Sequence, residues 1–525
     1  MENVKNNFYI HNMKYVYILF FFMTKFCHSM AQSIGFTNKT DLLPNRPFVG
    51  FLSKAMVDIN KDGYDDIIRI NSKDKSLTII YNKNNGQFEE TLIGELNVEP
   101  ISTTVGDVDN NGYLDVLTGG FFDGVLVRRN QGGNSFITDT IKQPLIWMQG
   151  SNLVDINNDG ILDFMACNDA GLNQIWKNNR NTGFEVVSDW IDFRTTPVSN
   201  NSGNYGAAWA DIDNDGDLDL YIAKCSVYAM GPANASDPRR INQLFINHTY
   251  DRVNGQIVKN PKDFSINSSG WFSEEAEGHN LKISGQSWTA DFADIDNDGD
   301  QDLLVTNHEL PTMLLENDGT GHFTDITSSS GLAGIVEPLQ GLMRDFDNDG
   351  YVDILISGDM PAQLWLNNKN KTFTKFEPFG ATKTTSFAIG DINNDGFLDV
   401  YVSHFPKVDA EDELWINQPN KNRYLGINLQ GSASNRDGIG AKITLHLSDG
   451  TRQTREVRAG ESYGISNSLT QLFGLGADAN VLKVEVLWPS GQKTYFSNPP
   501  INQYLSLEEF CPAKTCIPVT AIVKK

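Results

Sequence analysis

The chain has 525 residues, with 42 Lys and Arg against 66 Asp and Glu, and a formal net charge of −24. This surplus of acid argues against a nucleic-acid partner, because such proteins neutralise phosphates with a basic stripe. A hydrophobic content of 40%, with 30 Phe, 16 Tyr and 9 Trp, also excludes disorder driven by charge, since these side chains can fill a large core.

Residues 1–31 are predicted to form a cleaved export signal. Lys5 and Lys14 precede an apolar run at 15–23, and small residues stand at Ser29 and Ala31, where a signal peptidase would cut. The run has nine residues, about half of what a membrane span requires. An N-terminal anchor or a buried strand is the alternative. We expect a mature chain without a membrane span that is secreted, or held at the cell surface or in the periplasm.

Four cysteines follow the predicted cleavage point. Cys511 and Cys516, separated by four residues near the C-terminus, are predicted to close a small disulfide loop. Cys167 and Cys225 follow similar strands in neighbouring repeats, and we expect free, buried thiols there, with a disulfide as the alternative.

An acidic nine-residue pattern, Asp-x-Asp/Asn-x-Asp/Asn-Gly-x-x-Asp, occurs seven times and is the strongest signal in the sequence. Successive copies start 49, 48, 56, 83, 51 and 46 residues apart, which is the spacing of a structural repeat. The copies begin at Asp58, Asp107, Asp155, Asp211, Asp294, Asp345 and Asp391. The acidity of the chain is therefore mainly a property of these seven loops.

The chemistry of the pattern is that of a calcium loop. Oxygens at positions 1, 3, 5 and 9, with a main-chain carbonyl at position 7, suit a hard cation that takes about six to eight oxygen ligands. An EF-hand is excluded, because no copy has an acidic residue at position 12. We predict up to seven Ca²⁺ sites, with a stabilising role rather than a direct part in function. Loop by loop, the predicted ligands are Asp58, Asn60, Asp62, Tyr64 and Asp66; Asp107, Asp109, Asn111, Tyr113 and Asp115; Asp155, Asn157, Asp159, Ile161 and Asp163; Asp211, Asp213, Asp215, Asp217 and Asp219; Asp294, Asp296, Asp298, Asp300 and Asp302; Asp345, Asp347, Asp349, Tyr351 and Asp353; and Asp391, Asn393, Asp395, Phe397 and Asp399.

Short β-branched runs flank the loops and predict strands. Runs such as 207–210 (AAWA) precede a loop, and runs such as 66–70 (DIIRI) follow one. A third strand with an Asn/Gly turn, as in 363–370 (QLWLNNKN), and a fourth strand, as in 323–327 (FTDIT), complete the unit. Four strands over about 48 residues describe a propeller blade. The last unit lacks a fourth strand, and residues 35–40 are predicted to supply it and close the ring. A linear solenoid is the alternative.

Two families resemble this sequence. The loops are similar to those of FG-GAP/VCBS repeats, the calcium-bearing blades also found in integrin α-chain propellers. Residues 435–441 (NRDGIGA), 473–476 (FGLG) and 488–491 (WPSG) resemble the ASPIC/UnbV domain of the cartilage acidic protein family and its bacterial relatives. One departure is 466–468, Ser-Asn-Ser where Ser-Gln-Ser is expected. The resemblance implies an all-β chain: a signal peptide (1–31), a seven-bladed propeller (32–419), a smaller β-sandwich-like domain (420–509) and a tail (510–525).

A ligand-binding rim is predicted at the blade end opposite the loops. Residues just after the second strands lie there, roughly 17–20 Å from the loops at about 3.3 Å per residue. The candidate partner-binding residues are Asp169, His308, Asp359 and His404. Solvated loop polarity is the alternative reading of these residues.

The insertion between the fourth and fifth loops, at 225–280, is either a partner-binding lid or a passive surface loop. The sequence contains no zinc helix and no phosphate loop. It therefore favours an extracellular binding or adhesion module for a protein or glycan, of undetermined oligomeric state. The alternative is a calcium-dependent polysaccharide lyase or hydrolase with its site on the rim.

Overall fold

The computed structural model describes residues 34–98, 100–132, 134–180, 183–253, 256–260, 271–335, 337–405, 410–509 and 522–524. The chain divides into two units, Met1–Gly35 and Phe36–Lys525, and the architecture described below belongs to the second. The predicted export signal and the Cys511–Cys516 disulfide lie outside the described residues. None of the described helices has the length and apolar character needed to cross a membrane.

Within the described residues, seven antiparallel sheets follow the acidic repeat, and we call them blades 1 to 7 in chain order. In each blade the acidic loop joins the first strand to the second. The strands are β2 (Lys54–Val57), β3 (Asp66–Ile70), β4 (Ser76–Asn82) and β5 (Phe88–Glu95) in blade 1; β6 (Pro100–Gly106), β7 (Asp115–Gly120), β8 (Val125–Asn130) and β9 (Phe136–Ile141) in blade 2; β10 (Met148–Val154), β11 (Asp163–Asn168), β12 (Gln174–Asn178) and β13 (Phe184–Val187) in blade 3; β14 (Asn204–Ala210), β15 (Asp219–Lys224), β16 (Gln243–Asn247) and β19 (Phe272–Glu274) in blade 4; β20 (Ser287–Ala293), β21 (Asp302–Asn307), β22 (Met313–Asn317) and β23 (Phe323–Asp325) in blade 5; β24 (Pro338–Arg344), β25 (Asp353–Gly358), β26 (Met360–Asn367) and β27 (Phe373–Phe376) in blade 6; and β28 (Thr384–Gly390), β29 (Asp399–His404), β30 (Glu413–Asn417) and β1 (Phe36–Asn38) in blade 7.

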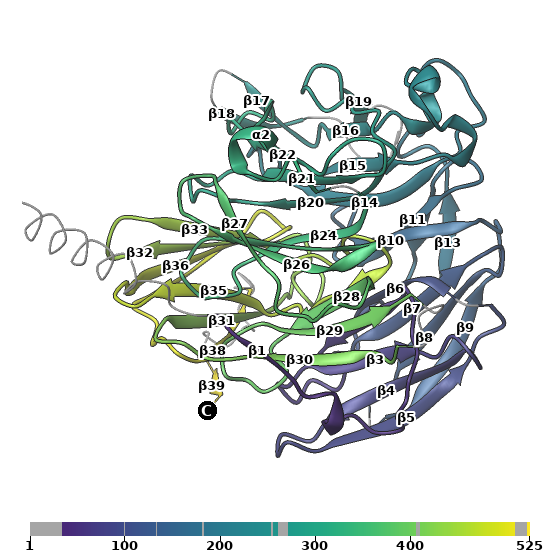
Figure 1. Ribbon diagram of the computed structural model, residues 1–525. Helices are drawn as coiled ribbons and strands as arrows, with labels where there is room; N and C mark the ends of the chain where they lie inside the picture. Colours follow the sequence, from purple (N-terminus) through teal and green to yellow (C-terminus); the bar gives the residue numbers. More distant parts are fainter. Residues whose placement is uncertain are drawn as a thin grey trace, which may run out of the picture. The chain divides into compact units, whose positions relative to one another are not determined.

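The blades form a closed ring (Figure 1). Each first strand contacts the first strand of the next blade, and β28 of blade 7 contacts β2 of blade 1. Strand β1 pairs with β30, with Phe36 opposite Asn417, so the N-terminal segment completes the last blade as predicted. This pairing removes an open sheet edge. The all-β propeller class predicted from the repeat is confirmed.

Burial explains the composition of the strands. Every residue of β3 and β7 is buried, because first and second strands pack between neighbouring blades, and such strands read as continuous β-branched runs. The outer strand β9 is largely exposed and carries polar residues. The predicted fourth strand at 323–327 ends at Asp325, because the Asp325 carboxylate accepts a hydrogen bond from Thr327 N and turns the chain. The short helices are η1 (Thr40–Leu42), η2 (Val227–Ala229), η3 (Pro232–Asn234), η4 (Pro238–Arg240) and α2 (Thr327–Ser330).

The insertion in blade 4 reaches both ends of the blade. Its first part, with η2 to η4, joins the second strand to the third, and the hairpin β17 (Tyr250–Val253) and β18 (Gln256–Lys259) lies between the third and the fourth. Arg240 is 2% exposed and pairs with Glu309 at 2.7 Å, whereas Tyr228 is 76% exposed. Part of the insertion is therefore fixed to blade 5 by a buried ion pair.

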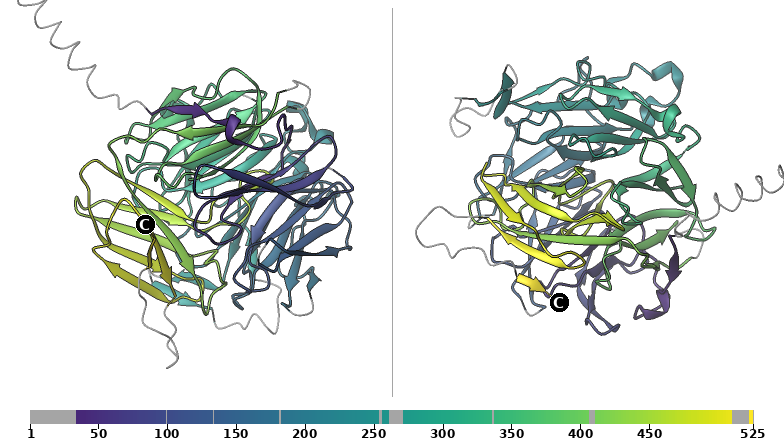
Figure 2. Two further views of the ribbon diagram at one scale, coloured as in Figure 1. Left: turned by 90° about the horizontal axis from the view of Figure 1, so that it is seen from below. Right: turned by 90° about the vertical axis from the view of Figure 1, so that its left-hand side faces the viewer.

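Two four-stranded sheets follow the propeller, as predicted for a sandwich-like domain. Their orders are β35-β31-β38-β39 and β33-β32-β36-β37. The strands are β31 (Arg423–Gln430), β32 (Lys442–Leu447), β33 (Arg452–Glu456), β35 (Gln471–Gly476), β36 (Val481–Leu487), β37 (Lys493–Ser497), β38 (Tyr504–Glu508) and β39 (Ile522–Lys524). Their core is continuous with that of blades 2 and 3, since Ile439 and Trp488 belong to the same buried cluster as Val108 and Leu153. In Figure 2 these sheets, in yellow and yellow-green, lie over one face of the ring.

One segment of this C-terminal domain, residues 458–468, enters the ring, and we call it the plug. Its strand β34 (Ile465–Ser466) pairs in parallel with β2, and Ala459 bridges to Leu153 of β10. Tyr463, only 2% exposed, accepts a hydrogen bond from Gln340 at its carbonyl and stacks near the ring of Tyr205. The plug contacts the first strand of every blade, through Ala55, Thr103, Leu153, Tyr205, Phe292, Gln340 and Ile389.

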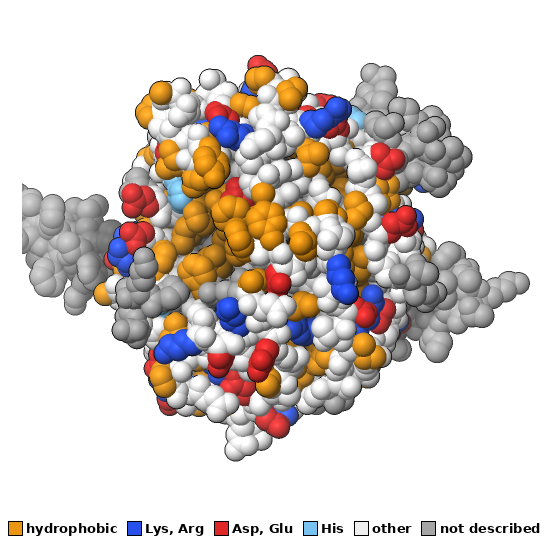
Figure 3. Space-filling model, turned by 90° about the vertical axis from the view of Figure 1, so that its right-hand side faces the viewer, with side chains coloured by type: hydrophobic (Ala, Val, Ile, Leu, Met, Phe, Trp, Pro, Cys, Tyr) orange, Lys and Arg blue, Asp and Glu red, His pale blue; other side chains and the backbone are white. Residues whose placement is uncertain are grey.

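The face turned away from the C-terminal sheets carries a band of hydrophobic side chains (Figure 3). The connections between second and third strands run at this end of the blades. One of them holds Phe121 and Phe122, which are 53% and 41% exposed, and the ring centroid of Phe121 lies 5.0 Å from that of Trp147. We call Phe121, Phe122, Leu145 and Trp147 the aromatic patch.

Candidate functional site

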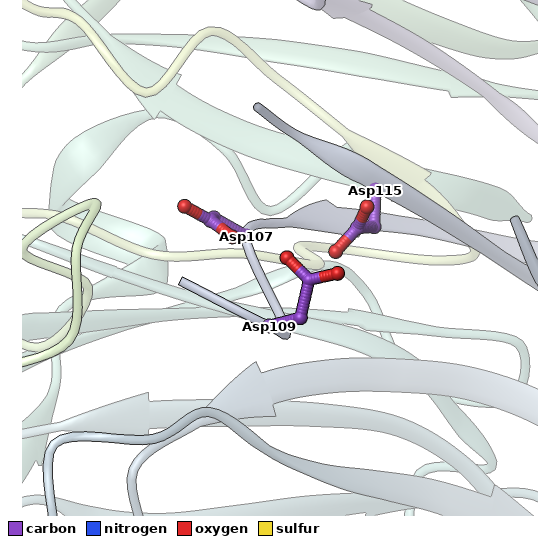
Figure 4. Close-up of side chains that lie close together, drawn as sticks. All are labelled: Asp107, Asp109 and Asp115. Atoms are coloured by element: carbon purple, nitrogen blue, oxygen red, sulfur yellow. The ribbon is translucent and has the colours of Figure 1, made fainter. Parts of the chain in front are cut away.

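Each acidic loop is shaped by hydrogen bonds from its own backbone. In blade 2, Asp107 Oδ1 accepts from Asn111 N at 3.0 Å and Asp107 Oδ2 accepts from Gly112 N at 2.7 Å. Asn110 and Gly112 have φ of 56° and 96°, so the chain turns twice in the left-handed region, which favours glycine and asparagine. The Asp107, Asp109 and Asp115 side chains converge as a result (Figure 4).

Four loops bring three carboxylates close enough to hold a metal ion, with ligand oxygens within 4.8 Å of one another. These groups are Asp107, Asp109 and Asp115; Asp211, Asp213 and Asp215; Asp294, Asp296 and Asp302; and Asp345, Asp347 and Asp353. The loops of blades 1, 3 and 7 have Asn at position 3, and that amide donates to the carboxylate at position 5, as Asn60 does to Asp62 at 3.0 Å. The seven predicted sites therefore fall into two chemical classes.

The loop carboxylates are placed where ionisation is unfavourable. Burial, with a smaller contribution from neighbouring carboxylates, raises the pKa of Asp107 to about 7 and that of Asp115 to about 8. The same causes raise the pKa of Asp294 to about 7. Buried like charges of this kind need a proton or a cation to offset their repulsion.

Sequence reasoning missed an asparagine at the end of every third strand. In blade 2, Asn130 N donates to Asp115 Oδ1 at 2.7 Å, and Asn130 Nδ2 donates to the Ile59 carbonyl of the preceding loop at 3.1 Å. Asn247 differs, because its amide donates to Leu218 within its own blade. The seven residues are Asn82, Asn130, Asn178, Asn247, Asn317, Asn367 and Asn417. Aligning the repeats beyond the loop itself would have found them.

The C-terminal domain contacts all seven loops. Asp437 of the 435–441 motif accepts from Lys61 Nζ at 3.0 Å and from Asp107 N at 2.7 Å. Lys442 Nζ donates to Asp211 Oδ2 at 3.2 Å in blade 4. Each of the other four loops also contacts the domain: Gly160 lies against Ala433, Gln301 against Arg458, Asn348 against Gly476, and Asp391 against Tyr504. The loops therefore lie between the ring and the C-terminal sheets.

The four predicted rim residues lie at the end of the blades opposite the loops, each with partners of its own. Asp169 accepts from Gln149, and His308 Nδ1 accepts from Trp288 Nε1 at 2.9 Å. Asp359, whose side chain is 53% exposed, pairs with Lys383 Nζ at 2.5 Å. His404 is 1% exposed, and its ring contacts the carbonyl of that same lysine. Among the described residues, no contact joins His308 to Asp359 or His404.

The two predicted thiols are placed as expected. Cys167 and Cys225 are free and buried, and burial raises the pKa of each to about 12. A thiol held protonated in this way is a poor nucleophile, so neither cysteine is a candidate catalytic group.

Comparisons with known proteins match both predicted families. A family model described as FG-GAP-like repeat matches residues 58–118, 155–222 and 345–402, and one described as ASPIC and UnbV matches residues 431–511. Cartilage acidic protein 1 of Xenopus tropicalis is 22% identical over 478 residues, covering 68% of this chain and 73% of that protein. The protein of the same name from Mus musculus is 21% identical over 462 residues, covering 65% and 70%. The predicted family resemblance is confirmed.

Comparison with solved structures gives matches of lower similarity. A lectin from Agrocybe aegerita, described for its specific recognition of non-reducing terminal N-acetylglucosamine, has a TM-score of 0.40 and 18% identity, covering 64% of this chain and 80% of that one. BBS1N in complex with ARL6DN has a TM-score of 0.43 and 9% identity, covering 72% and 96%.

Proposed function

From its place among FG-GAP-repeat proteins that end in an ASPIC and UnbV domain, we propose that the chain is an exported, calcium-stabilised propeller. It acts outside the cell as a binding module for a protein or glycan. The observation that carries the proposal is the division between the two faces of the ring. The acidic loops lie against the C-terminal domain, whereas the opposite face presents exposed aromatic side chains.

The acidic loops suit calcium in their donor chemistry. Carboxylate, amide and main-chain oxygens are the ligands of a hard cation. Every loop offers carboxylate and main-chain oxygens, and the loops that contain Asn at a ligand position offer an amide oxygen as well. Bound calcium would offset the repulsion among the buried carboxylates, so its binding free energy would contribute to folding. We propose up to seven ions, bound most strongly by the four loops with three converging carboxylates.

The aromatic patch supplies the chemistry of a protein contact. Phe and Trp side chains dominate the energy of protein interfaces, and exposed apolar groups gathered on one face mark interaction sites. Asp169, whose backbone N donates to the Trp147 carbonyl at 3.0 Å, is proposed as a polar contact beside the patch, and His308 and Asp359 as polar contacts elsewhere at the same end of the blades. No observation favours the polysaccharide-active enzyme, because the rim residues named for it hold separate partners.

A binding screen tests the proposal. Residues 32–525 are offered to a glycan array and to a panel of purified extracellular proteins, with calcium present. The pair Phe121→Ser and Phe122→Ser should weaken binding of a protein partner at least tenfold. The control Leu482→Ser, at a 49% exposed apolar residue of the C-terminal domain, should leave binding unchanged. The proposal fails if neither class of partner binds the wild-type chain.

A further inference from the structure

A large polar cleft lies between the ring and the C-terminal domain, apart from the aromatic patch. It has a volume of about 620 Å³ and is walled by the loops of blades 1 and 7 on one side and by β31 and β38 on the other. A second cavity of about 330 Å³ shares Asn428, Thr470 and Tyr504 with it. Ligand sites commonly occupy clefts of this size between domains.

The acids at the floor of the cleft already have partners. Asp58 accepts from the backbone of Asp62 and Gly63, and Asp62 accepts from Tyr64 N at 3.0 Å. Asp65 accepts from Asp391 N at 3.0 Å and from Ser468 Oγ at 2.9 Å. These carboxylates are therefore engaged within the protein or, under the proposed function, by the calcium of their own loops, so they are not free for a further cationic ligand.

An anionic ligand also fits poorly. Among the described side chains, no lysine or arginine lines the larger cavity, and Lys61 and Arg436 line only the smaller one. Lys61 is in addition paired with Asp437. A phosphate, sulfate or uronate would therefore find no basic side chain to pair with among the described residues of the larger cavity.

The groups left to meet a ligand are phenols, amides and hydroxyls. Tyr64, Tyr424 and Tyr504 line the cleft, and the ring centroids of the last two lie 5.7 Å apart. Among the residues that the structure describes, the Tyr64 and Tyr424 hydroxyls and the Asn84 amide make no hydrogen bond. Amides and phenols both donate and accept, and tyrosine adds an apolar ring face.

We propose that this cleft binds a neutral oligosaccharide. Asn428 Oδ1 accepts from Thr470 Oγ1 and Gln503 Nε2 donates to the Pro500 carbonyl, so sugar hydroxyls would meet the other side-chain atom of each amide, Asn428 Nδ2 and Gln503 Oε1, and the Asn84 amide. The C–H faces of the sugar would rest on the tyrosine rings. The cleft has room for a short oligosaccharide rather than a single ring. This inference rests on the proposed role as a binding module, and it gives the glycan class and its location.

The test is a titration of residues 32–525, with calcium present, against three probes: neutral oligosaccharides that score on the array, sulfated or uronate-bearing ones, and a lysine-rich peptide. The double variant Asn428→Ala and Gln503→Ala should weaken binding of the neutral sugar at least tenfold. The control Tyr495→Ser, at a residue 56% exposed on β37, should bind like the wild type. Thermal unfolding of each variant verifies that it is folded.

A second readout applies if the double variant does not fold. Addition of the neutral sugar to the wild-type chain should slow hydrogen exchange in residues 502–505 and 83–85. The cleft proposal is wrong if the neutral sugar binds without protecting these segments, or if the double variant still binds it. Either result would leave the proposed role as a binding module unaffected. Binding of the peptide or the acidic glycans alone also overturns the cleft proposal. Absence of any glycan or protein partner would overturn both proposals.

Discussion

Burial and one hydrogen bond keep the His308 ring neutral in the folded chain. Trp288 Nε1 donates to His308 Nδ1 at 2.9 Å, so that nitrogen must carry a lone pair, and burial lowers the pKa of His308 to about 4. The unfolded chain, with the ordinary pKa near 6.5, binds this proton at a higher pH than the folded chain does. Stability contributed by the neutral ring is therefore complete above about pH 6.5 and is lost as the pH falls toward 4.

We expect the Tm of the wild-type chain to fall more between about pH 7 and pH 4.5 than the Tm of His308→Asn. The asparagine side-chain oxygen can accept from Trp288 but does not titrate. Differential scanning calorimetry at the two pH values measures the difference. Equal pH dependence in the two proteins would show that His308 is protonated in the folded state.

Substitutions at Asp296 and Asp298, in the acidic loop of blade 5, test whether these carboxylates bind calcium or act only as surface charges. Lys371 Nζ contacts both Asp296, at 2.5 Å, and Glu316, which lies outside the loop. We expect Asp296→Asn with Asp298→Asn to lose part of the increase in Tm that calcium gives. Glu316→Gln removes the other partner of Lys371 and should keep that increase.

The same pair of variants is informative without calcium. In chelator, Asp296→Asn with Asp298→Asn should be at least as stable as the wild type, because two mutually repelling carboxylates are gone. A double variant that is equally destabilised with calcium and with chelator would assign these residues a purely structural role.

At the scale of elements, the plug explains why the ring and the C-terminal domain belong together. Tyr463 is buried among strands of several blades and donates from its hydroxyl to Gln149. Glu461 and Asn467 hydrogen-bond to one another at 2.7 Å, and Asn467 accepts from Ile389 N at 2.9 Å. Asn467 is the residue that departs from the family pattern, and in the plug it bonds both Glu461 and the backbone of blade 7.

Truncation of the Tyr463 side chain in the plug should destabilise the whole ring. Tyr463→Ala removes a buried aromatic and is expected to lower the free energy of unfolding by about 3–5 kcal/mol. Tyr495→Ala, at a residue 56% exposed on the same domain, should change it by less than about 0.5 kcal/mol. Urea denaturation measures both, and similar midpoints for the two variants would rule out a stabilising plug.

Some elements could be predicted from the sequence and others could not. The loop pattern predicted β3, β7 and β15 closely, because glycine and aspartate specify the turn locally and β-branched runs follow it. The plug was not predictable, since Ser466 pairs with Ala55, about 400 residues away in the chain, and no local pattern encodes such a partner. The burial of one rim residue was equally unpredictable: His404 is 1% exposed and its ring contacts the Lys383 carbonyl, which periodicity cannot show.

For the whole molecule, the continuous core predicts cooperative unfolding. The buried cluster that joins Ile439 to Leu153 crosses from the C-terminal sheets into the ring, and all seven loops touch the domain. Calorimetry of residues 32–525 should therefore show one transition, with equal calorimetric and van't Hoff enthalpies. Two separated transitions would mean that the ring and the C-terminal sheets are stable independently.

The central claim is that calcium in the acidic loops holds the ring together, and thermal unfolding with calcium and with chelator tests it most directly. A site filled at a thousand times its Kd contributes about 4 kcal/mol. Several such sites should raise the Tm of residues 32–525 in calcium by about 10 °C or more over its value in chelator. An unchanged Tm in chelator would contradict the account.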